Sequence, residues 1–297
     1  MNSAQHPDPA MNQLHPVIVT TIVELRTRIA QARAQGRSVG FVPTMGALHA
    51  GHRQLMDEAC RECGFIVVSI FVNPLQFDRK DDLERYPRTL AQDEELCAAA
   101  GVNVIFAPTA TELYPQEQFT FVDVPALTNV LCGAFRPGHF RGVATVVAKL
   151  IGIGQLDRAY FGQKDAQQLA VIRRMVQDLN FPLEIRSVPT VRETDGLALS
   201  SRNRHLTPTE RATAPVLAQT LFAATNQIQR GENSSSVIRQ QALETLGNYE
   251  EIRVEYFDLV DTVTLQPVEK IGRSVLIAAA VWLGATRLID NVVVEMD

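Results

Sequence analysis

Two histidines, His49 and His52, stand three residues apart in a glycine-containing segment that reads FVPTMGALHAGH from Phe41. A short apolar run precedes this segment and a helix-forming run from Gln54 to Cys63 follows it, so the segment joins a strand to a helix. Backbone N–H groups and the helix dipole at such a junction favour an anion. Side chains three residues apart on a helix share a face, so both imidazoles can reach one ligand. We therefore predict a phosphate-binding turn whose imidazoles stabilise a transferring phosphoryl group, with a glycine turn carrying two surface histidines as the alternative.

A second segment, FVNPLQF from Phe71, places Asn73 and Gln76 after another apolar run. Amide side chains both donate and accept hydrogen bonds, which suits a small polar substrate that carries hydroxyl and carboxylate groups. The simpler alternative is a proline turn in which Asn73 caps its own backbone.

Lys164 lies at the start of a further predicted helix, after Gly162 in the segment YFGQKD. A lysine at a glycine turn is well placed to meet a phosphate oxygen as a mobile point charge. Gln168 follows one helical turn later and faces the same side. Asp165 has the simpler reading of a helix N-cap. We favour phosphate contact by Lys164.

Two arginine-containing segments and one acidic side chain complete the candidate set. Ser200, Ser201 and Arg202 together resemble a phosphate clamp, because a guanidinium binds planar oxyanions bidentately, although the segment also reads as an ordinary linker. Arg136 lies in a donor-rich loop that can hold a carboxylate or phosphate or simply face solvent. Asp93, in a predicted helix, is a candidate ligand for hydrated magnesium, although a solvated helix face is the simpler reading.

The elements that position these side chains alternate through the first two thirds of the chain. Strand-like apolar runs are expected at 39–42, 65–72, 102–106, 158–161 and 183–188, and helices at 54–63, 89–100, 142–153 and 166–179. Continuous apolar strands separated by helices indicate a parallel sheet covered on both faces. Right-handed crossovers then give a doubly wound α/β sheet with its ligand crevice at the carboxyl ends of the strands. The candidate turns fall at those ends, and 78–88 is expected to be a charged loop.

The pattern changes near Arg202. The segment Thr207–Glu210 carries a threonine N-cap, a proline and a glutamate, and opens a predicted helix toward Arg230. A second helix is expected at 235–246, followed by strand-like runs at 254–260, 274–280 and 287–294. This order predicts a smaller α+β domain with an antiparallel sheet. We accordingly expect an extension over 1–15, a Rossmann-like domain over 16–190 and the smaller domain over 191–297.

Composition narrows the function classes. The net charge of −5 shows no basic footprint for nucleic acid, and no apolar run approaches the roughly 20 residues of a membrane span. The first 15 residues lack the features of a secretory signal, so we expect a cytoplasmic protein. Of the four cysteines, Cys60 and Cys63 have the spacing of half a zinc site or a redox pair, but reduced structural thiols are the better interpretation.

Taken together in this order, the motifs resemble those of the pantothenate synthetases, the pantoate–β-alanine ligases of the HxGH nucleotidyltransferase superfamily. The segments that carry the resemblance are 43–52, 72–77, 136–143, 161–168, 195–203 and the C-terminal 279–291. The resemblance covers the chain from about His15 to its end.

The resemblance implies two half-reactions on one site. Pantoate attacks the α-phosphate of Mg-ATP to give pantoyl adenylate and pyrophosphate, and β-alanine then displaces AMP. It also implies a homodimer in which the smaller domain acts as a lid. Positioning and charge stabilisation should dominate the first step.

The resemblance also assigns residues position by position. It implies ATP binding by Met45, Gly46, Ala47, Leu48, His49, Ala50, Gly51, His52, Gly162, Gln163, Lys164, Asp165, Val191, Leu199, Ser200, Ser201 and Arg202. Among these, His49, His52, Lys164 and Arg202 are the expected catalytic residues, with His52 as proton donor to the leaving group. Gln76 and Gln168 are expected to hold pantoate, Gln76 also to meet β-alanine, and Asn73 and Arg136 to line the β-alanine and phosphate side. Asp93 is the magnesium candidate.

The chain departs from the family pattern at Ala166, Val191 and Arg204-His205, which puts local nucleotide packing in question rather than the reaction. Two other functions fit part of the pattern. One is an HxGH adenylyltransferase that stops at an adenylylated product and has no need of Asn73 and Gln76. The other is a non-catalytic ATP-binding regulator that kept the fold.

Overall fold

The computed structural model describes residues 15–78 and 80–296, so the extension expected over 1–15 lies outside the described residues apart from His15. Its larger sheet has six strands in the order β1-β4-β3-β2-β5-β6, all paired in parallel. These strands are β1 (Val17–Val19), β2 (Val39–Thr44), β3 (Phe65–Ile70), β4 (Val104–Phe106), β5 (Arg158–Gly162) and β6 (Glu184–Val188). The parallel sheet predicted from the apolar runs is confirmed, and β1 is a strand that those runs did not predict.

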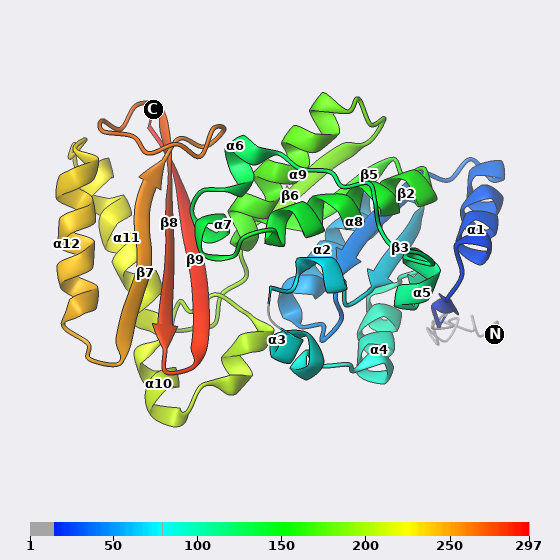
Figure 1. The fold of residues 1–297 in the computed structure, drawn as a ribbon, viewed down its shortest axis with the longest axis horizontal. Helices are drawn as coiled ribbons and strands as arrows, with labels where there is room; N and C mark the ends of the chain where they lie inside the picture. Colours follow the sequence, from blue (N-terminus) through cyan, green and yellow to red (C-terminus); the bar gives the residue numbers. More distant parts are fainter. Residues whose placement is uncertain (1–14, 79, 297) are drawn as a thin grey trace, which may run out of the picture.

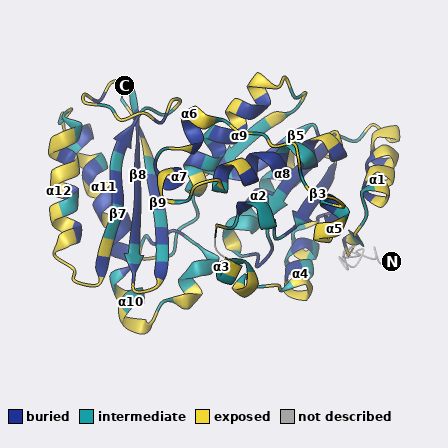
Figure 2. Ribbon diagram, viewed as in Figure 1, coloured by how far each residue is buried: buried dark blue, intermediate teal, exposed yellow. Residues whose placement is uncertain are grey.

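Helices cover both faces of this sheet (Figure 1), as a parallel sheet requires. Buried side chains of α1 (Ile22–Ala34), α8 (His139–Gly154) and α9 (Ala166–Asp178) share one apolar core with one face. Those of α2 (Ala50–Glu62) and α4 (Leu90–Ala100) share another with the opposite face. Figure 2 shows the central strands as largely buried and the outward helix surfaces as exposed.

The strand order places the ligand crevice. β2 lies between β3 and β5: from β2 the chain adds β3 and β4 on one side, and it then returns to add β5 and β6 on the other side. Ligands of doubly wound sheets bind at the carboxyl ends of the strands where the order reverses in this way. The His49 segment follows β2 and the Lys164 segment follows β5, so the two meet at this point.

Short helices occupy several segments expected to be loops. They are η1 (Pro74–Gln76), α3 (Lys80–Arg85), α5 (Ala110–Leu113), α6 (Pro125–Thr128), α7 (Cys132–Phe135), η2 (Gln163–Asp165) and η3 (Ser201–His205). The expectation that 78–88 is a loop is therefore wrong where α3 forms.

The C-terminal part is a three-stranded antiparallel sheet in the order β7-β8-β9, as predicted. Its elements are α10 (Pro208–Thr213), α11 (Pro215–Gln229), α12 (Ser235–Gly247), β7 (Ile252–Val260), β8 (Ser274–Leu283) and β9 (Thr286–Glu295). The single helix expected toward Arg230 is divided at Pro215, which has no N–H to continue the ladder. One face of the sheet packs on α11 and α12, and the other packs toward α7, where Phe135 stacks on Tyr256.

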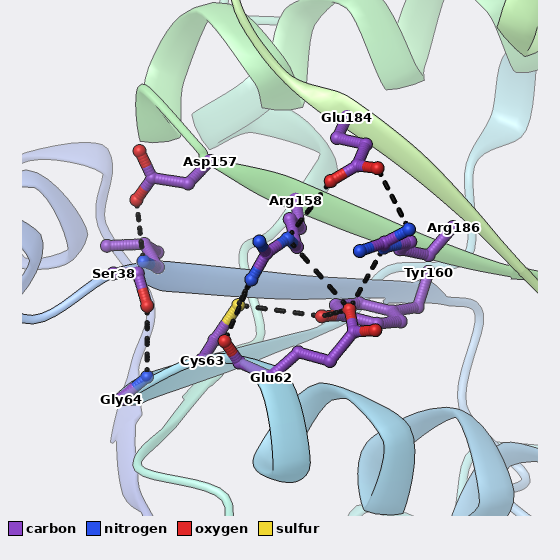
Figure 3. A network of polar contacts seen from close by, with 10 residues as sticks. Ser38, Glu62, Cys63, Gly64, Asp157, Arg158, Tyr160, Glu184 and Arg186 are labelled. Atoms are coloured by element: carbon purple, nitrogen blue, oxygen red, sulfur yellow. Dashed lines mark hydrogen bonds and ion pairs between the residues drawn. The ribbon is translucent and has the colours of Figure 1, made fainter.

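The amino ends of β5 and β6 carry a network of paired charges (Figure 3). Arg158 Nε lies 3.1 Å from Glu184 Oε2, and Arg186 Nε lies 3.0 Å from Glu62 Oε2. The buried Tyr160 hydroxyl donates to the same Glu62 oxygen at 2.8 Å. This hydrogen bond, with the two arginines, lowers the pKa of Glu62. The charged groups of this network therefore satisfy one another.

The four cysteines are free thiols, three of them buried. Cys60 donates to the carbonyl of Ala100 at 3.2 Å, and burial raises its pKa. Among the described residues, none of the helices has both the length and the apolar character that a membrane span requires.

Candidate active site

A cavity of about 980 Å³ lies between the carboxyl ends of the parallel strands and strand β9. Most of the predicted site residues line it: Met45, His49, Gly51, His52, Asn73, Gln76, Arg136, Gly162, Lys164, Asp165, Gln168, Val191, Leu199, Ser200, Ser201 and Arg202. Residues from five separate segments thus converge on one volume. The predicted site residues that do not line it are Gly46, Ala47, Leu48, Ala50, Gln163 and Asp93.

The turn after β2 is shorter than the sequence suggested. β2 ends at Thr44, and α2 begins at Ala50 rather than at Gln54, with His49 as its N-cap. His49 Nδ1 accepts from the N–H of Gly51 at 3.1 Å, and His52 Nδ1 accepts from the N–H of His49 at 3.3 Å. The two imidazoles therefore form a capping box, a role usually taken by serine or threonine with glutamate.

This capping arrangement sets the protonation of both rings. A ring nitrogen that accepts from a backbone N–H carries no proton, so each imidazole is neutral with its proton on Nε2. Burial, together with the cations of Lys164 and Arg204, lowers the pKa of His49 to about 4. Burial and the neighbouring His49 lower the pKa of His52 to about 3. At neutral pH the pair thus offers two Nε2–H hydrogen-bond donors rather than an imidazolium.

The side chain of Asp93 on α4 supports the turn between β2 and α2. Its Oδ2 accepts from the N–H of Ala47 at 3.1 Å and its Oδ1 from the N–H of Leu48 at 2.8 Å. Ala47 has a φ of 51°, a conformation that costs energy for any residue with a Cβ, so the turn needs such support. A Cβ on Gly46, whose φ is 84°, would lie 3.0 Å from Asp93 Oδ2.

The position of Asp93 corrects two expectations. Two of the turn amides assigned to a phosphate are occupied by this carboxylate. Asp93 is only 2% exposed, does not line the cavity and has both oxygens engaged, so the structure does not support it as a magnesium ligand. We assign it to positioning the turn.

The two amide side chains after β3 have different roles: Asn73 supports Gln76, and Gln76 contacts the cavity. Asn73 is 1% exposed; its Nδ2 donates to Gln76 Oε1 at 3.0 Å and to the carbonyl of Gly142 at 3.1 Å. Its Oδ1 accepts from the Tyr114 hydroxyl at 3.0 Å and also from the N–H of Leu75, which is the backbone cap of the alternative reading. Asn73 is thus fully engaged in holding Gln76, whose amide lies against Met45 Sδ at 3.0 Å in the cavity wall.

Arg136 belongs to a chain of contacts beside Gln76. Its Nη2 lies 3.0 Å from Asp78 Oδ1, and its Nη1 lies 3.5 Å from His139 Nε2. His139 Nδ1 donates to the carbonyl of Gln76 at 2.7 Å. Burial and the guanidinium of Arg136 lower the pKa of His139 to about 4. The sequence predicted a role for Arg136, but no local pattern marked His139 or Asp78 as its partners.

The turn after β5 presents Lys164 to the cavity. Lys164 Nζ lies 4.0 Å from Asp165 Oδ1. Asp165 occupies the N-cap position of α9, as the simpler reading has it, but its side chain makes no N-cap hydrogen bond. Gln167 and Gln168 both line the cavity, but Gln167 is only 6% exposed and its Nε2 donates to the carbonyls of Leu127 and Val130. Tertiary packing thus engages the amide of Gln167 in backbone hydrogen bonds that the sequence did not indicate.

The remaining cationic segment runs from Val191 to Arg202. The N–H of Leu199 donates to the carbonyl of Val191 at 2.9 Å, and Ser200 Oγ accepts from the N–H of Arg202 at 3.2 Å. Ser201 hydrogen bonds to the hydroxyl of Tyr86. In the part of the chain that the structure describes, no ion pair is found for Arg202.

The departures from the family pattern cluster around this cavity. Ala166 and His205 line it, and Arg204 lies near enough to His49 to lower its pKa. Tyr86, Asp290 and Asn291, none of them predicted from the sequence, also line the cavity, and Arg192 pairs with Asp290 behind it. The quoted C-terminal segment ends at Asn291, but nothing in its pattern signalled a contact with the Lys164 turn.

Comparisons with known proteins agree with the family resemblance that the sequence motifs suggested. A family model described as pantoate-beta-alanine ligase matches residues 17–293. The chain is 52% identical over 280 residues to a pantothenate synthetase of Moorella thermoacetica, covering 94% of this chain and 99% of that protein. It is 51% identical over 279 residues to pantothenate synthetase 1 of Bradyrhizobium diazoefficiens, covering 94% and 98%.

Solved structures are similar over the same span. A crystal structure of pantothenate synthetase from Thermus thermophilus superposes with a TM-score of 0.88 at 46% identity, covering 93% of this chain and 98% of that one. A pantoate-beta-alanine ligase from Francisella tularensis, complexed with beta-gamma ATP and beta-alanine, superposes with a TM-score of 0.76 at 32% identity, covering 93% and 97%.

Proposed function

The chain belongs to the pantoate-beta-alanine ligase family, and from this premise we propose how its cavity condenses (R)-pantoate with β-alanine in an ATP-dependent reaction. The products are pantothenate, AMP and pyrophosphate. The Francisella relative, described as complexed with beta-gamma ATP and beta-alanine, supports a site that nucleotide and amine share. The observation that carries the assignment of roles is the convergence of His49, His52, Lys164 and Arg202 with two glutamines in one cavity.

In the first half-reaction a pantoate carboxylate oxygen bonds to the α-phosphorus of ATP. The bond from that phosphorus to the bridging oxygen breaks, and pyrophosphate leaves with the electron pair. Lys164 and Arg202 offset the charge that develops on the phosphates, with Ser200 and Ser201 beside them. His49 and His52 contribute Nε2–H donors. Because both rings are neutral, we assign to His52 a hydrogen bond to the leaving group rather than proton transfer from an imidazolium.

In the second half-reaction the β-alanine amine attacks the acyl carbon of pantoyl adenylate, and AMP and a proton are released. Gln76 and Gln168 orient pantoate by its hydroxyl and carboxylate oxygens, and Gln76 also meets the amine. Asn73 acts through Gln76, which it holds at 3.0 Å. Arg136, fixed by Asp78, lines the β-alanine side. Holding both reactants in one cavity lowers the entropy cost of each step.

Magnesium is proposed to enter with the nucleotide. No group of three or more histidine, cysteine or acidic side chains arranged for a metal is found in residues 15–78 and 80–296. Mg²⁺ commonly keeps several waters and is held by substrate phosphates with one or two carboxylates. Asp165, on the cavity wall beside Lys164, is the carboxylate best placed to meet it, and when bound the ion would neutralise phosphate charge.

Three organisational features are also proposed. Residues 16–190 form the ATP- and pantoate-binding domain, and residues 191–297 form a lid over the cavity. The enzyme is a homodimer. It acts in the cytoplasm, without a membrane or nucleic-acid partner.

Pyrophosphate release from Mg-ATP by the purified protein tests this proposal. Release that depends on pantoate, and that continues past one turnover only when β-alanine is added, establishes both half-reactions. Release with another acid or phosphate acceptor instead would keep the nucleotide site and overturn the substrate assignment. Absence of ATP consumption with every plausible acid would favour a non-catalytic regulator.

A further inference from the structure

The Lys164 turn is supported from the antiparallel sheet. Asn291, on β9 and 7% exposed, donates from Nδ2 to the carbonyl of Gln163 at 3.0 Å and to the carbonyl of Lys164 at 2.7 Å. These residues form the 3-10 turn η2, a type of helix with poor internal hydrogen-bond geometry. One amide group therefore ties together two successive carbonyls of this turn.

Asn291 is itself held by a buried ion pair. Arg192 binds Asp290 bidentately, with distances of 2.6 and 2.9 Å, and the Asp290 side chain is only 2% exposed. Asp290 Oδ1 also accepts from the N–H of Asn291 at 2.8 Å. A bidentate arginine–carboxylate pair fixes orientation as well as distance, so residues 290 and 291 cannot shift independently of Arg192.

Arg192 connects this unit to the second cationic segment. Its Nη1 donates to the carbonyl of Gly196 at 3.0 Å, and its backbone pairs with Ala198 across the hairpin that leads to Ser200 and Arg202. Two neighbouring residues in the middle of β9 thus contact both phosphate-facing segments, Asn291 through the Lys164 turn and Asp290 through Arg192. The strand therefore links the segment of Lys164 to the segment of Arg202.

We propose that Asn291 is a positioning residue for adenylation, acting through the backbone of Lys164 and fixed by the Arg192–Asp290 pair. This inference rests on the phosphate role of Lys164 in the proposed function. A displacement of a charged group by about 1 Å can cost on the order of 100-fold in rate, whereas binding of the triphosphate by several other contacts is affected less. Asn291 therefore contributes to kcat more than to the KM for ATP.

The test begins with Asn291→Ala, which removes both donors without adding charge. We expect the single-turnover rate of pantoate-dependent pyrophosphate release to fall by about 10-fold, with the KM for ATP changed by less than about threefold. In a Lys164→Ala background the same substitution should change the rate by less than about twofold, because a residue that acts through Lys164 loses its effect when that side chain is gone. Equal effects in both backgrounds would overturn the proposal.

Hydrogen exchange gives a readout that does not depend on activity. Peptides that span 160–168 should exchange faster in Asn291→Ala, while peptides of α2 stay unchanged. Asp261→Ala is the matched control, since Asp261 accepts hydrogen bonds in a turn of the same C-terminal part but does not line the cavity. It should leave the rate and the 160–168 exchange unchanged.

These measurements separate the two proposals. If the wild-type protein releases no pyrophosphate with pantoate, the proposed function fails, and the exchange experiment still decides whether Asn291 holds the turn. If Asn291→Ala does not fold, Asn291→Ser, which keeps one donor, replaces it. The same changes in rate and in exchange are then expected, but smaller. Unchanged exchange over 160–168 in a folded variant overturns the inference.

Discussion

The two ends of strand β5 are built from similar residue types but differ in how their charges are satisfied. At the amino end, Arg158 and Arg186 meet Glu62 and Glu184 at 3.0 to 3.1 Å (Figure 3). At the carboxyl end, Lys164 has an acidic neighbour only at 4.0 Å, within the described residues. Arg202 and two neutral histidines complete that end.

This difference indicates which end of the strand binds a ligand. Charges that satisfy one another contribute a little stability and leave no net field. Cations on a cavity wall that lack a close ion-pair partner create a local positive potential that a polyanion can neutralise. The same contrast distinguishes the arginine-rich network of Figure 3, which we read as structural, from the Lys164 side, which we read as the phosphate site.

The strongest test of this difference removes one cation from each end of β5 and compares the adenylation rates. Lys164→Ala is expected to lower the adenylation rate by on the order of 10²–10³, and His52→Ala by a similar factor, because each supplies a donor where charge develops. Rapid-quench single turnovers measure both. Arg158→Ala, at the other end of the strand, is the matched control and should leave the rate within about twofold. Comparable losses in Lys164→Ala and Arg158→Ala would contradict the comparison.

A substitution at Asp93 tests whether a buried carboxylate supports the His49 turn without itself contacting a ligand. Asp93→Asn places an NH₂ group or a weaker acceptor against the N–H groups of Ala47 and Leu48. We expect the free energy of unfolding to fall by about 1–3 kcal/mol and the rate to fall about 10-fold. Urea unfolding and single-turnover kinetics measure the two effects.

The exposed Glu95 on the same helix provides the control for Asp93. Glu95→Gln should change neither quantity appreciably. An Asp93→Asn variant with the stability and rate of the wild-type protein would show that the turn holds its left-handed Ala47 without this carboxylate.

Acid pH should destabilise the carboxyl end of β5, where the neutral histidines lie, more than the amino end, where the charges are paired. His49, His52 and His139 are neutral in the folded protein, with pKa values lowered to about 4, 3 and 4. The unfolded chain binds protons at these histidines near pH 6.5, so stability is fully present above that pH and is lost as the pH falls toward 4. Each histidine contributes a slope of up to about 1.4 kcal/mol per pH unit.

Thermal unfolding between pH 8 and pH 5 measures this slope. His52→Gln, which keeps an acceptor but cannot titrate, should have a shallower pH dependence than the wild-type protein. A wild-type unfolding temperature that stays constant over this interval would mean that the three rings are not held neutral.

The smallest effect is expected at the paired end itself. Glu62→Gln weakens the contacts with Tyr160 and Arg186 but keeps a polar side chain there. We expect the free energy of unfolding to fall by about 1 kcal/mol or less, with the rate unchanged, because partly exposed ion pairs contribute little. A fall in the adenylation rate would show that this network communicates with the cavity.

The sequence determined the class of fold and the membership of the site to a large extent. Apolar runs separated by helices identify a parallel sheet, since strands buried on both faces cannot tolerate polar side chains. Glycine turns followed by helices place His49, Lys164 and their neighbours at strand ends, and the structure confirms that these segments share one cavity. Such features are encoded by residues close in sequence, so a local pattern suffices to detect them.

Contacts between distant segments were decided by the tertiary structure alone. Asp93 meets Leu48 across 45 residues, and Asn291 meets Gln163 across 128. The packing of α4 beneath the His49 turn makes Asp93 an anchor instead of a metal ligand, and burial makes both histidines neutral. Gln167 likewise donates to the carbonyls of Leu127 and Val130, 40 and 37 residues away. No local pattern encodes these outcomes, because the environment of a side chain is set by whichever distant residues the packed core brings beside it.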